Sequence, residues 1–304
     1  GPLAGGVDYF SYQDSAGVRD LWEGEAESKR TGYLTDLISD AAVDFIGRQK
    51  GAKEPFLLSV HYTAPHWPWE TRDDEAESQR IGARIIHTDG GSVKTYQTMI
   101  RHMDEGIGRI AQALEASGAD ENTLLVFTSD NGGERFSDTW PLVGKKMDLL
   151  EGGIRVPYIV RWPARVKAGG ITAQTAITMD WAATFLDAAG AKPHADYPMD
   201  GMSLLSMLDA PGKVVDRALF WRMLFRNQKA LREGAWKWLV LEGDEFLFDL
   251  SRDSRERANL VKRYPERATA MREKYEAWAK TMPAIAPDAK FSIPYTRAEL
   301  AQPG

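Results

Sequence analysis

Residues 123–133, with the sequence TLLVFTSDNGG, decide how the fold of this chain is interpreted. Apolar and β-branched residues run from Thr123 to Thr128 and then give way to a polar, glycine-containing segment. A short apolar run of this kind is typical of a buried strand in a parallel sheet covered by helices. In such sheets, ligands bind beyond the carboxyl ends of the strands, where Asp130 and Asn131 follow. We therefore expect a buried strand that leads into a binding site.

Helix-like and strand-like segments alternate through the first two-thirds of the chain. Apolar residues three and four positions apart predict amphipathic helices at 33–50, 93–117 and 179–189. Short apolar runs predict strands at 56–60, 123–128 and 156–160. Strands that alternate with helices predict an α/β fold, with a mainly parallel sheet sandwiched by helices.

The pattern changes after Pro211. Short strand-like segments separated by turns occupy residues 218–222, 228–232, 236–241 and 245–250, and a charged amphipathic helix follows at 266–280. This order predicts a small antiparallel α+β subdomain. We therefore expect a catalytic domain over residues 1–210 and a C-terminal subdomain over residues 211–304.

The composition is that of an ordinary globular protein and restricts what the chain can bind. Of 304 residues, 43% are hydrophobic and 27% are charged, and the formal net charge is −6. A mildly acidic chain is a poor candidate for nucleic-acid binding, which needs a basic surface. The absence of cysteine excludes disulfides and thiolate metal sites within these residues. No apolar run approaches the ~18 residues of a membrane segment.

The adjacent Asp130 and Asn131 offer one carboxylate and one amide oxygen. Both are hard donors suited to Ca²⁺ or Mg²⁺, and the glycines that follow let the backbone approach closely. Taken alone, however, Asp-Asn-Gly is more often a plain turn with local side-chain to backbone hydrogen bonds. The metal interpretation therefore depends on what other segments bring to the same place.

Two other segments offer groups that bind or protonate an anion. In APHWP, residues 64–68, two prolines fix the loop and orient His66, which can donate a proton to a leaving oxygen. Trp67 beside it is either a core residue or a platform for a sugar or aryl ring. In residues 144–157, Lys146 brings a positive charge to an oxyanion, whereas Lys145 is only a candidate helper. We also expect Arg155 to pair with Glu151 across the Glu-Gly-Gly bend of that segment.

Together these segments resemble the sulfatases of the alkaline-phosphatase superfamily, in order and over nearly the whole chain. The matching segments are residues 1–12, 64–68, 123–133, 146–157, 221–240 and 247–260. The resemblance implies that Asp130 and Asn131 are late ligands of a divalent ion, usually calcium. It also implies that Lys146 contacts the sulfate and steadies the leaving group, and that His66 lies beside the sulfate ester.

The resemblance also implies parts that these residues do not contain. The nucleophile of the family is a formylglycine made from the first residue of a (C/S)-x-P-S-R string, and further metal ligands are a pair of Asp residues before it. This chain has no cysteine and no such serine string. We therefore expect a fragment that lacks the N-terminal part, that is inactive alone, and that is poorly stable. Localisation stays open, because any export signal would precede these residues.

Three functions remain in competition. The leading hypothesis is a sulfuric ester hydrolase that acts with a divalent metal on sulfate monoesters of a small molecule or a glycan. The first alternative is a phosphonate or phosphate monoester hydrolase of the same superfamily, because the oxyanion site is much alike. The second alternative is a non-catalytic relative that binds anions or glycans.

Overall fold

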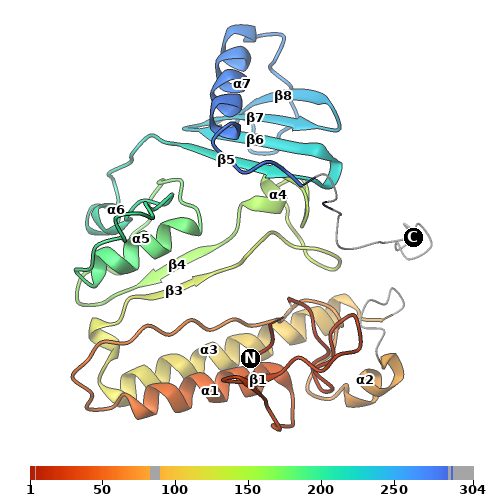
Figure 1. Cartoon of the computed structure of the whole chain (residues 1–304), viewed down its shortest axis with the longest axis vertical. Helices are drawn as coiled ribbons and strands as arrows, with labels where there is room; N and C mark the ends of the chain where they lie inside the picture. Colours follow the sequence, from red (N-terminus) through yellow and green to blue (C-terminus); the bar gives the residue numbers. More distant parts are fainter. Residues whose placement is uncertain (4, 83–89, 287–288, 290–304) are drawn as a thin grey trace. The chain divides into compact units, whose positions relative to one another are not determined.

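The computed structural model describes residues 1–3, 5–82, 90–286 and 289 (Figure 1). The chain divides into two compact units, residues 1–123 and residues 124–293. The domain boundary predicted near residue 210 falls within the second unit and remains a prediction. The end of the predicted C-terminal subdomain, residues 287–288 and 290–304, lies outside the described residues.

Two long helices form the frame of the first unit, as the spacing of apolar residues predicted. The helices are α1 (Leu34–Arg48), α2 (Glu75–Ile81), α3 (Val93–Ser117) and the short η1 (Asp120–Asn122), and the strands are β1 (Trp22–Glu23) and β2 (Ala26–Glu27). Figure 1 shows α1 and α3 side by side, and Ala42, Ile46, Ile110 and Leu114 form the buried cluster between them. Ser92 caps α3 by accepting a hydrogen bond from the Thr95 amide.

The segment 56–60 is extended but pairs with no strand among the described residues. Phe56, Leu58 and Val60 pack on the cluster of α1 and α3, whereas Leu57 is 72% exposed. This alternation is the burial pattern of a strand with one covered face. The prediction of a paired strand at 56–60 is therefore wrong for the described residues. A strand of a sheet needs a neighbouring strand to hydrogen-bond with, as well as an extended backbone.

The second unit begins with a two-stranded pair packed on helices. Its first elements are β3 (Leu125–Thr128), α4 (Glu151–Ile154), β4 (Tyr158–Arg161), α5 (Met179–Ala188) and α6 (Leu205–Asp209). Val126 of β3 and Val160 of β4 pack against a cluster that contains Trp181 and Met207. One face of the pair is therefore covered by α5 and α6 (Figure 1).

The strands β3 and β4 run antiparallel, whereas the sequence predicted a mainly parallel sheet. Val126 lies opposite Val160, and Thr128 lies opposite Tyr158. A parallel neighbour needs a long crossover, usually through a helix. The connection between β3 and β4 contains only the single turn α4 and returns the chain beside β3.

The C-terminal part of the second unit confirms the predicted antiparallel subdomain. It consists of β5 (Ala218–Met223), η2 (Phe225–Asn227), β6 (Gln228–Glu233), β7 (Trp236–Leu241), β8 (Asp244–Asp249) and α7 (Pro265–Ala279). The four strands pair antiparallel in the order β5-β6-β7-β8. Leu231, Trp238 and Leu247 cover one face together with the buried side of α7.

The opposite face of the four-stranded sheet covers a loop of the predicted site. Ala230, Leu239 and Phe248 form a buried cluster with Leu149, which lies in the segment just before α4. Strand alternation explains this arrangement, because successive residues of β6 and β7 point to opposite faces. The small sheet therefore joins α7 on one side to residues 147–151 on the other.

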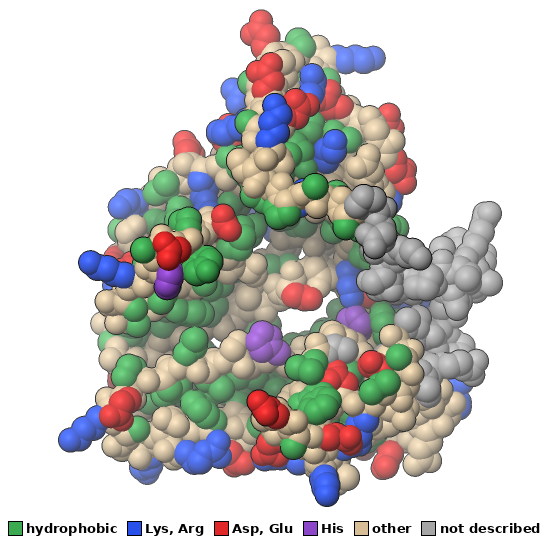
Figure 2. Space-filling view, in the orientation of Figure 1, with side chains coloured by type: hydrophobic (Ala, Val, Ile, Leu, Met, Phe, Trp, Pro, Cys, Tyr) green, Lys and Arg blue, Asp and Glu red, His purple; other side chains and the backbone are tan. Residues whose placement is uncertain are grey.

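The described surface mixes charges of both signs. On the face shown in Figure 2, basic and acidic side chains are interspersed over the described residues, without a continuous basic patch. The longest described helix, α3, has 25 residues and a polar outer side. Within the described residues, no helix combines the length and the hydropathy that a membrane span requires.

Candidate functional site

The strand β3 delivers Asp130 and Asn131 to a tight turn. The Asn131 amide donates to Asp130 Oδ1 at 2.9 Å, and Ser129 Oγ donates to the Asn131 carbonyl at 2.9 Å. These are the local hydrogen bonds expected of a plain turn. The Asp130 carboxylate is nevertheless exposed to solvent.

The glycines after this turn join it to the loop that carries Lys146. The Gly132 amide donates to the Gly153 carbonyl at 2.8 Å, and the Lys146 amide donates to the Gly133 carbonyl at 2.7 Å. A Cβ atom on Gly132 would lie 1.9 Å from the Gly152 carbonyl oxygen. The backbones are therefore in direct contact, and the turn and the loop form one block.

Lys146 is the more sheltered of the two adjacent lysines. Its side chain is 22% exposed, and Nζ lies 3.8 Å from Glu134 Oε2. Lys145 is exposed, and its backbone amide donates to Asp148 Oδ2 at 3.1 Å. The backbone contacts therefore place the segment of Lys146 beside the turn of Asp130 and Asn131, on the block at the end of β3.

The expected pair between Arg155 and Glu151 is wrong. Glu151 is 1% exposed and receives Lys237 Nζ at 3.0 Å on Oε1 and Arg232 Nη1 at 3.2 Å on Oε2. Both partners come from the four-stranded sheet, which the sequence analysis did not place against this loop. The available signal was Lys237 itself, a charged residue within the apolar run 236–241.

His66 lies in the first unit, on a closely packed loop. Its Nδ1 lies 2.8 Å from the Trp67 carbonyl oxygen, which can only accept, so Nδ1 carries a proton. The His66 carbonyl accepts from the Tyr9 hydroxyl at 2.9 Å. With Nδ1 fixed as a donor, the proton that His66 gains or loses is the one on Nε2.

Trp67 is largely a core residue of the first unit. It is 9% exposed, and its ring centroid lies 4.2 Å from that of His66. Of the two interpretations of Trp67, this burial favours core packing over an open platform. Its contact with the imidazole helps to fix the orientation of His66.

Comparison with known proteins identifies the family. A family model described as Sulfatase matches residues 4–191. The chain belongs to the sulfatase family. A second family model, described as N-sulphoglucosamine sulphohydrolase, C-terminal, matches residues 140–280.

Three relatives show how much of a sulfatase these residues represent. N-acetylgalactosamine-6-sulfatase of Mus musculus is 32% identical over 218 residues, which cover 69% of this chain and 39% of the mouse protein. A sulfatase of Formosa agariphila is 30% identical over 280 residues, which cover 81% of this chain and 50% of that protein. The crystal structure of Ps i-CgsB matches with a TM-score of 0.77 and 30% identity, over 92% of this chain and 65% of that one.

These relatives confirm the fold class predicted for the chain, the α/β class of the sulfatases with a C-terminal antiparallel sheet. The chain spans less than two-thirds of each relative, from 39% of the mouse protein to 65% of Ps i-CgsB. The four-stranded sheet lies within residues 140–280, the range matched by the second family model.

The donor types of this sulfatase-family block suit a hard divalent cation, but the described residues supply only part of a coordination shell. Asp130 offers a carboxylate and Asn131 an amide oxygen, whereas Ca²⁺ takes six to eight oxygen ligands. Within the described part of the chain, no group of three or more His, Cys, Asp or Glu side chains is placed to hold a metal ion. A calcium or magnesium role for this pair therefore remains a proposal.

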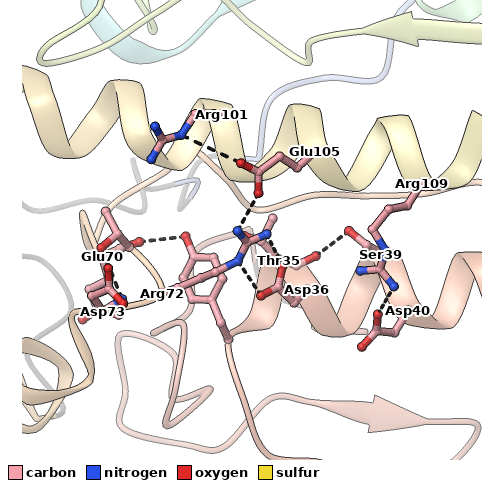
Figure 3. Close-up of polar contacts among 12 residues, drawn as sticks. Thr35, Asp36, Ser39, Asp40, Glu70, Arg72, Asp73, Arg101, Glu105 and Arg109 are labelled. Atoms are coloured by element: carbon pink, nitrogen blue, oxygen red, sulfur yellow. Dashed lines mark hydrogen bonds and ion pairs between the residues drawn. The ribbon is translucent and has the colours of Figure 1, made fainter.

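The segment that follows the His66 loop is anchored to both long helices (Figure 3). Arg72 donates from Nε and Nη2 to the two carboxylate oxygens of Asp36 on α1, at 2.7 and 2.8 Å. Its Nη1 donates to Glu105 Oε2 on α3 at 2.5 Å. The contacts of Arg72 with both helices fix one end of the loop relative to them.

His66 and the block at β3 belong to different units, so the prediction that they meet at one site stays a prediction.

A buried acidic pair lies beneath the same loop. Glu70 and Asp8 are both 0% exposed, and the Tyr9 amide donates to Glu70 Oε2 at 3.2 Å. Burial, and next the negative charge of Asp8, raises the pKa of Glu70 to about 9. A protonated Glu70 can donate to the Asp8 carboxylate, so that one proton satisfies both buried groups.

Replacing Glu70 by glutamine removes a pH dependence from the stability of the first unit. The folded pKa of Glu70, about 9, lies above its ordinary value, so its stabilising effect is present at low pH and is lost as pH rises toward 9. One proton gives a slope of about 1.4 kcal/mol per pH unit, or about 2 kcal/mol between pH 5.5 and 7. Hydrogen exchange of amides in α1 and α3, corrected for intrinsic rates, measures the opening free energy at both pH values.

The matched control is Glu54→Gln, because Glu54 is an exposed carboxylate of the same unit. We expect the control to keep the wild-type pH slope and Glu70→Gln to lose most of it. Equal slopes in both variants would show that Glu70 is ionised in the folded protein at neutral pH.

Proposed function

We propose that the protein containing this chain is a sulfatase that hydrolyses sulfate monoesters with the help of a divalent cation. The observation that carries the proposal is the block at the end of β3. There, backbone hydrogen bonds hold the Asp130–Asn131 turn against the loop of Lys146, at 2.7 and 2.8 Å. Membership of the sulfatase family supports a part in this reaction for the side chains of Asp130, Asn131 and Lys146.

The roles follow from the chemistry of each group. The Lys146 ammonium stabilises negative charge that develops on the sulfate and the leaving oxygen. With Nδ1 of His66 donating to a backbone carbonyl, its Nε2 is the atom that would pass a proton to the leaving oxygen. A divalent cation bound by Asp130 and Asn131 would supply further positive charge to the sulfate oxygens.

The nucleophile is expected outside these 304 residues. The sequence contains neither cysteine nor a serine in the (C/S)-x-P-S-R pattern. Sulfate ester hydrolysis through a covalent intermediate requires such a group. We therefore propose that the isolated chain has no sulfatase activity.

A sulfated glycan is the substrate class that the relatives favour, with a sulfated small molecule as the simpler alternative. One relative is named N-acetylgalactosamine-6-sulfatase, and Ps i-CgsB has been crystallised with k-i-k-neocarrahexaose. Both names refer to carbohydrate. We propose that the sulfate ester hydrolysed by this protein is likewise carried on a sugar.

The decisive experiment compares esters of different charge on the full-length protein with added calcium. We expect kcat/KM for 4-nitrophenyl sulfate to exceed that for the matching phosphate and phenylphosphonate esters by at least about tenfold. Preference for the phosphonate would overturn the proposal in favour of a phosphonate hydrolase. Binding of a sulfated glycan without any turnover would identify a non-catalytic relative.

A further inference from the structure

A lysine is buried on the face of the small sheet that covers the Lys146 loop. Lys237 of β7 is 0% exposed and lies opposite Arg232 and Phe248 in the strand register. Phe248 belongs to the cluster around Leu149, on the face away from α7. Burial of an ammonium group costs several kcal/mol unless opposite charges surround it.

Lys237 is compensated by two carboxylates that come from different segments. Its Nζ lies 3.0 Å from Glu151 Oε1 and 2.8 Å from Glu256 Oε1, and both carboxylates are at most 1% exposed. Arg232 adds a second cation 3.2 Å from Glu151 Oε2. Glu256 Oε2 also accepts a hydrogen bond from the Glu151 backbone amide at 2.6 Å. The four charges balance, and they bind the first residue of α4 to the sheet.

A second contact reaches the backbone next to Lys146. Gln228, which is 1% exposed, accepts from the Leu149 amide on Oε1 and donates from Nε2 to the Met147 carbonyl, both at 2.8 Å. One side-chain amide thus binds a donor and an acceptor of the loop at once. Arg226, also from the sheet region, lies 3.3 Å from Asp148 Oδ1.

These contacts hold a strained conformation. Met147 has a φ of 77°, in the left-handed region that side-chain-bearing residues rarely adopt. Such a conformation is unfavourable in itself and persists only where its surroundings fix it. On one side the Lys146 amide binds the Gly133 carbonyl, and on the other Gln228 binds the Met147 carbonyl. Lys146 therefore lies between two anchors.

We propose that Gln228 and Lys237 are positioning residues of the site: from the C-terminal sheet they hold the Lys146 loop in the conformation that presents its ammonium to the substrate. The inference rests on the proposed function, because it assigns to Lys146 a role at the sulfate. It gives the small sheet a part in the reaction without any contact with the substrate.

The test compares pairs of variants in the full-length protein. Gln228→Ala removes both bonds to the loop, and Asn259→Ala is its control, because Asn259 bridges Leu247 and Glu245 within the subdomain and does not contact the loop. Lys237→Met removes the buried charge, and Arg272→Met is its control, because Arg272 pairs with Glu245 on the α7 side. Each variant is assayed at a temperature at which it is folded.

We expect kcat for aryl sulfates to fall about 10- to 100-fold in Gln228→Ala and Lys237→Met, with a smaller change in KM, and to change little in the controls. If Lys146 steadies the leaving group, the dependence of kcat on leaving-group pKa also becomes steeper in these two variants. A purely structural role for the contacts would not change that slope. Equal kcat and equal slope in Gln228→Ala and Asn259→Ala would overturn the proposal.

Hydrogen exchange at the Lys146 amide separates this inference from the proposed function. We expect the amide to exchange faster in Gln228→Ala than in Asn259→Ala, whether or not the protein hydrolyses sulfates. Faster exchange in a protein without sulfatase activity would support the anchoring and refute the function. Unchanged exchange in an active sulfatase would refute the anchoring and leave the function intact.

Discussion

Replacing Lys146 by alanine in the full-length protein lowers kcat for an aryl sulfate by about 10²- to 10³-fold, the effect typical of removing one group that stabilises developing negative charge. The loop should survive the change, because the backbone hydrogen bonds that hold it do not involve the lysine side chain. The Lys146 amide donates to Gly133, and the Met147 carbonyl accepts from Gln228. The expected loss is therefore catalytic and not a loss of folding.

Two further variants make the Lys146 result specific. Lys145→Ala removes a neighbouring positive charge that is exposed, and we expect it to change kcat by less than about threefold, as a screened surface charge does. Lys146→Arg keeps the charge but replaces a compact ammonium with a larger planar group, so we expect partial activity. Steady-state kinetics with a chromogenic sulfate decides the question. Comparable losses in Lys145→Ala and Lys146→Ala would contradict the assignment of Lys146.

The sequence predicted the local elements of this chain well, because their signals are local. The helix predicted at 93–117 is α3 (Val93–Ser117), bounded by a serine cap and by Gly118 in a left-handed conformation. The four C-terminal strands and α7 likewise lie where alternation and helical spacing placed them. In these elements, the side chains within the segment and directly beside it determine where the helix or strand begins and ends.

Pairings between distant segments were predicted less well. The strand β3 pairs antiparallel with β4, which lies beyond the connection 129–157, and hydrophobic periodicity does not reveal which strands pair or in which direction. Glu151 was assigned to the nearest arginine in the sequence, whereas its partner Lys237 lies 86 residues further along the chain. A carboxylate in a short motif can satisfy its charge with any cation that the fold brings near, so proximity in sequence is a poor guide to its partner.

The predicted site stays a prediction, although two of its segments lie side by side. Asp130, Asn131 and Lys146 come together through backbone contacts among glycines, and the strings SDNGG and KMDLLEGG contain those glycines. His66 belongs to the other unit, so its place at the site stays a prediction that its own loop sequence does not test. The partners of Lys237 depend on the register of β7, which places this lysine on the face that covers the loop. There its ammonium contacts Glu256.

Replacing Gly132 by alanine should disrupt the block at the end of β3. The new Cβ would lie 1.9 Å from the Gly152 carbonyl oxygen and 2.9 Å from the Gly153 Cα atom. Both are backbone atoms, so no side-chain rotation relieves the clash, and the two segments must separate. Separation breaks the bond from the Gly132 amide to Gly153 and strains the one from Lys146 to Gly133. We expect a loss of ~3 kcal/mol or more, at the upper end for overpacking.

The control for this prediction is Gly108→Ala in α3, where an added Cβ has no heavy atom within 4 Å. That substitution should stabilise the helix slightly, by about 0.5–1 kcal/mol, because alanine loses less backbone entropy than glycine. Urea unfolding followed by tryptophan fluorescence compares the two variants with the wild type. If Gly132→Ala unfolds at the same urea concentration as Gly108→Ala, the two segments are not in contact. If instead Gly132→Ala is destabilised and its Lys146 amide exchanges rapidly, the tight glycine contact is what keeps the Asp130–Asn131 turn and the Lys146 loop together.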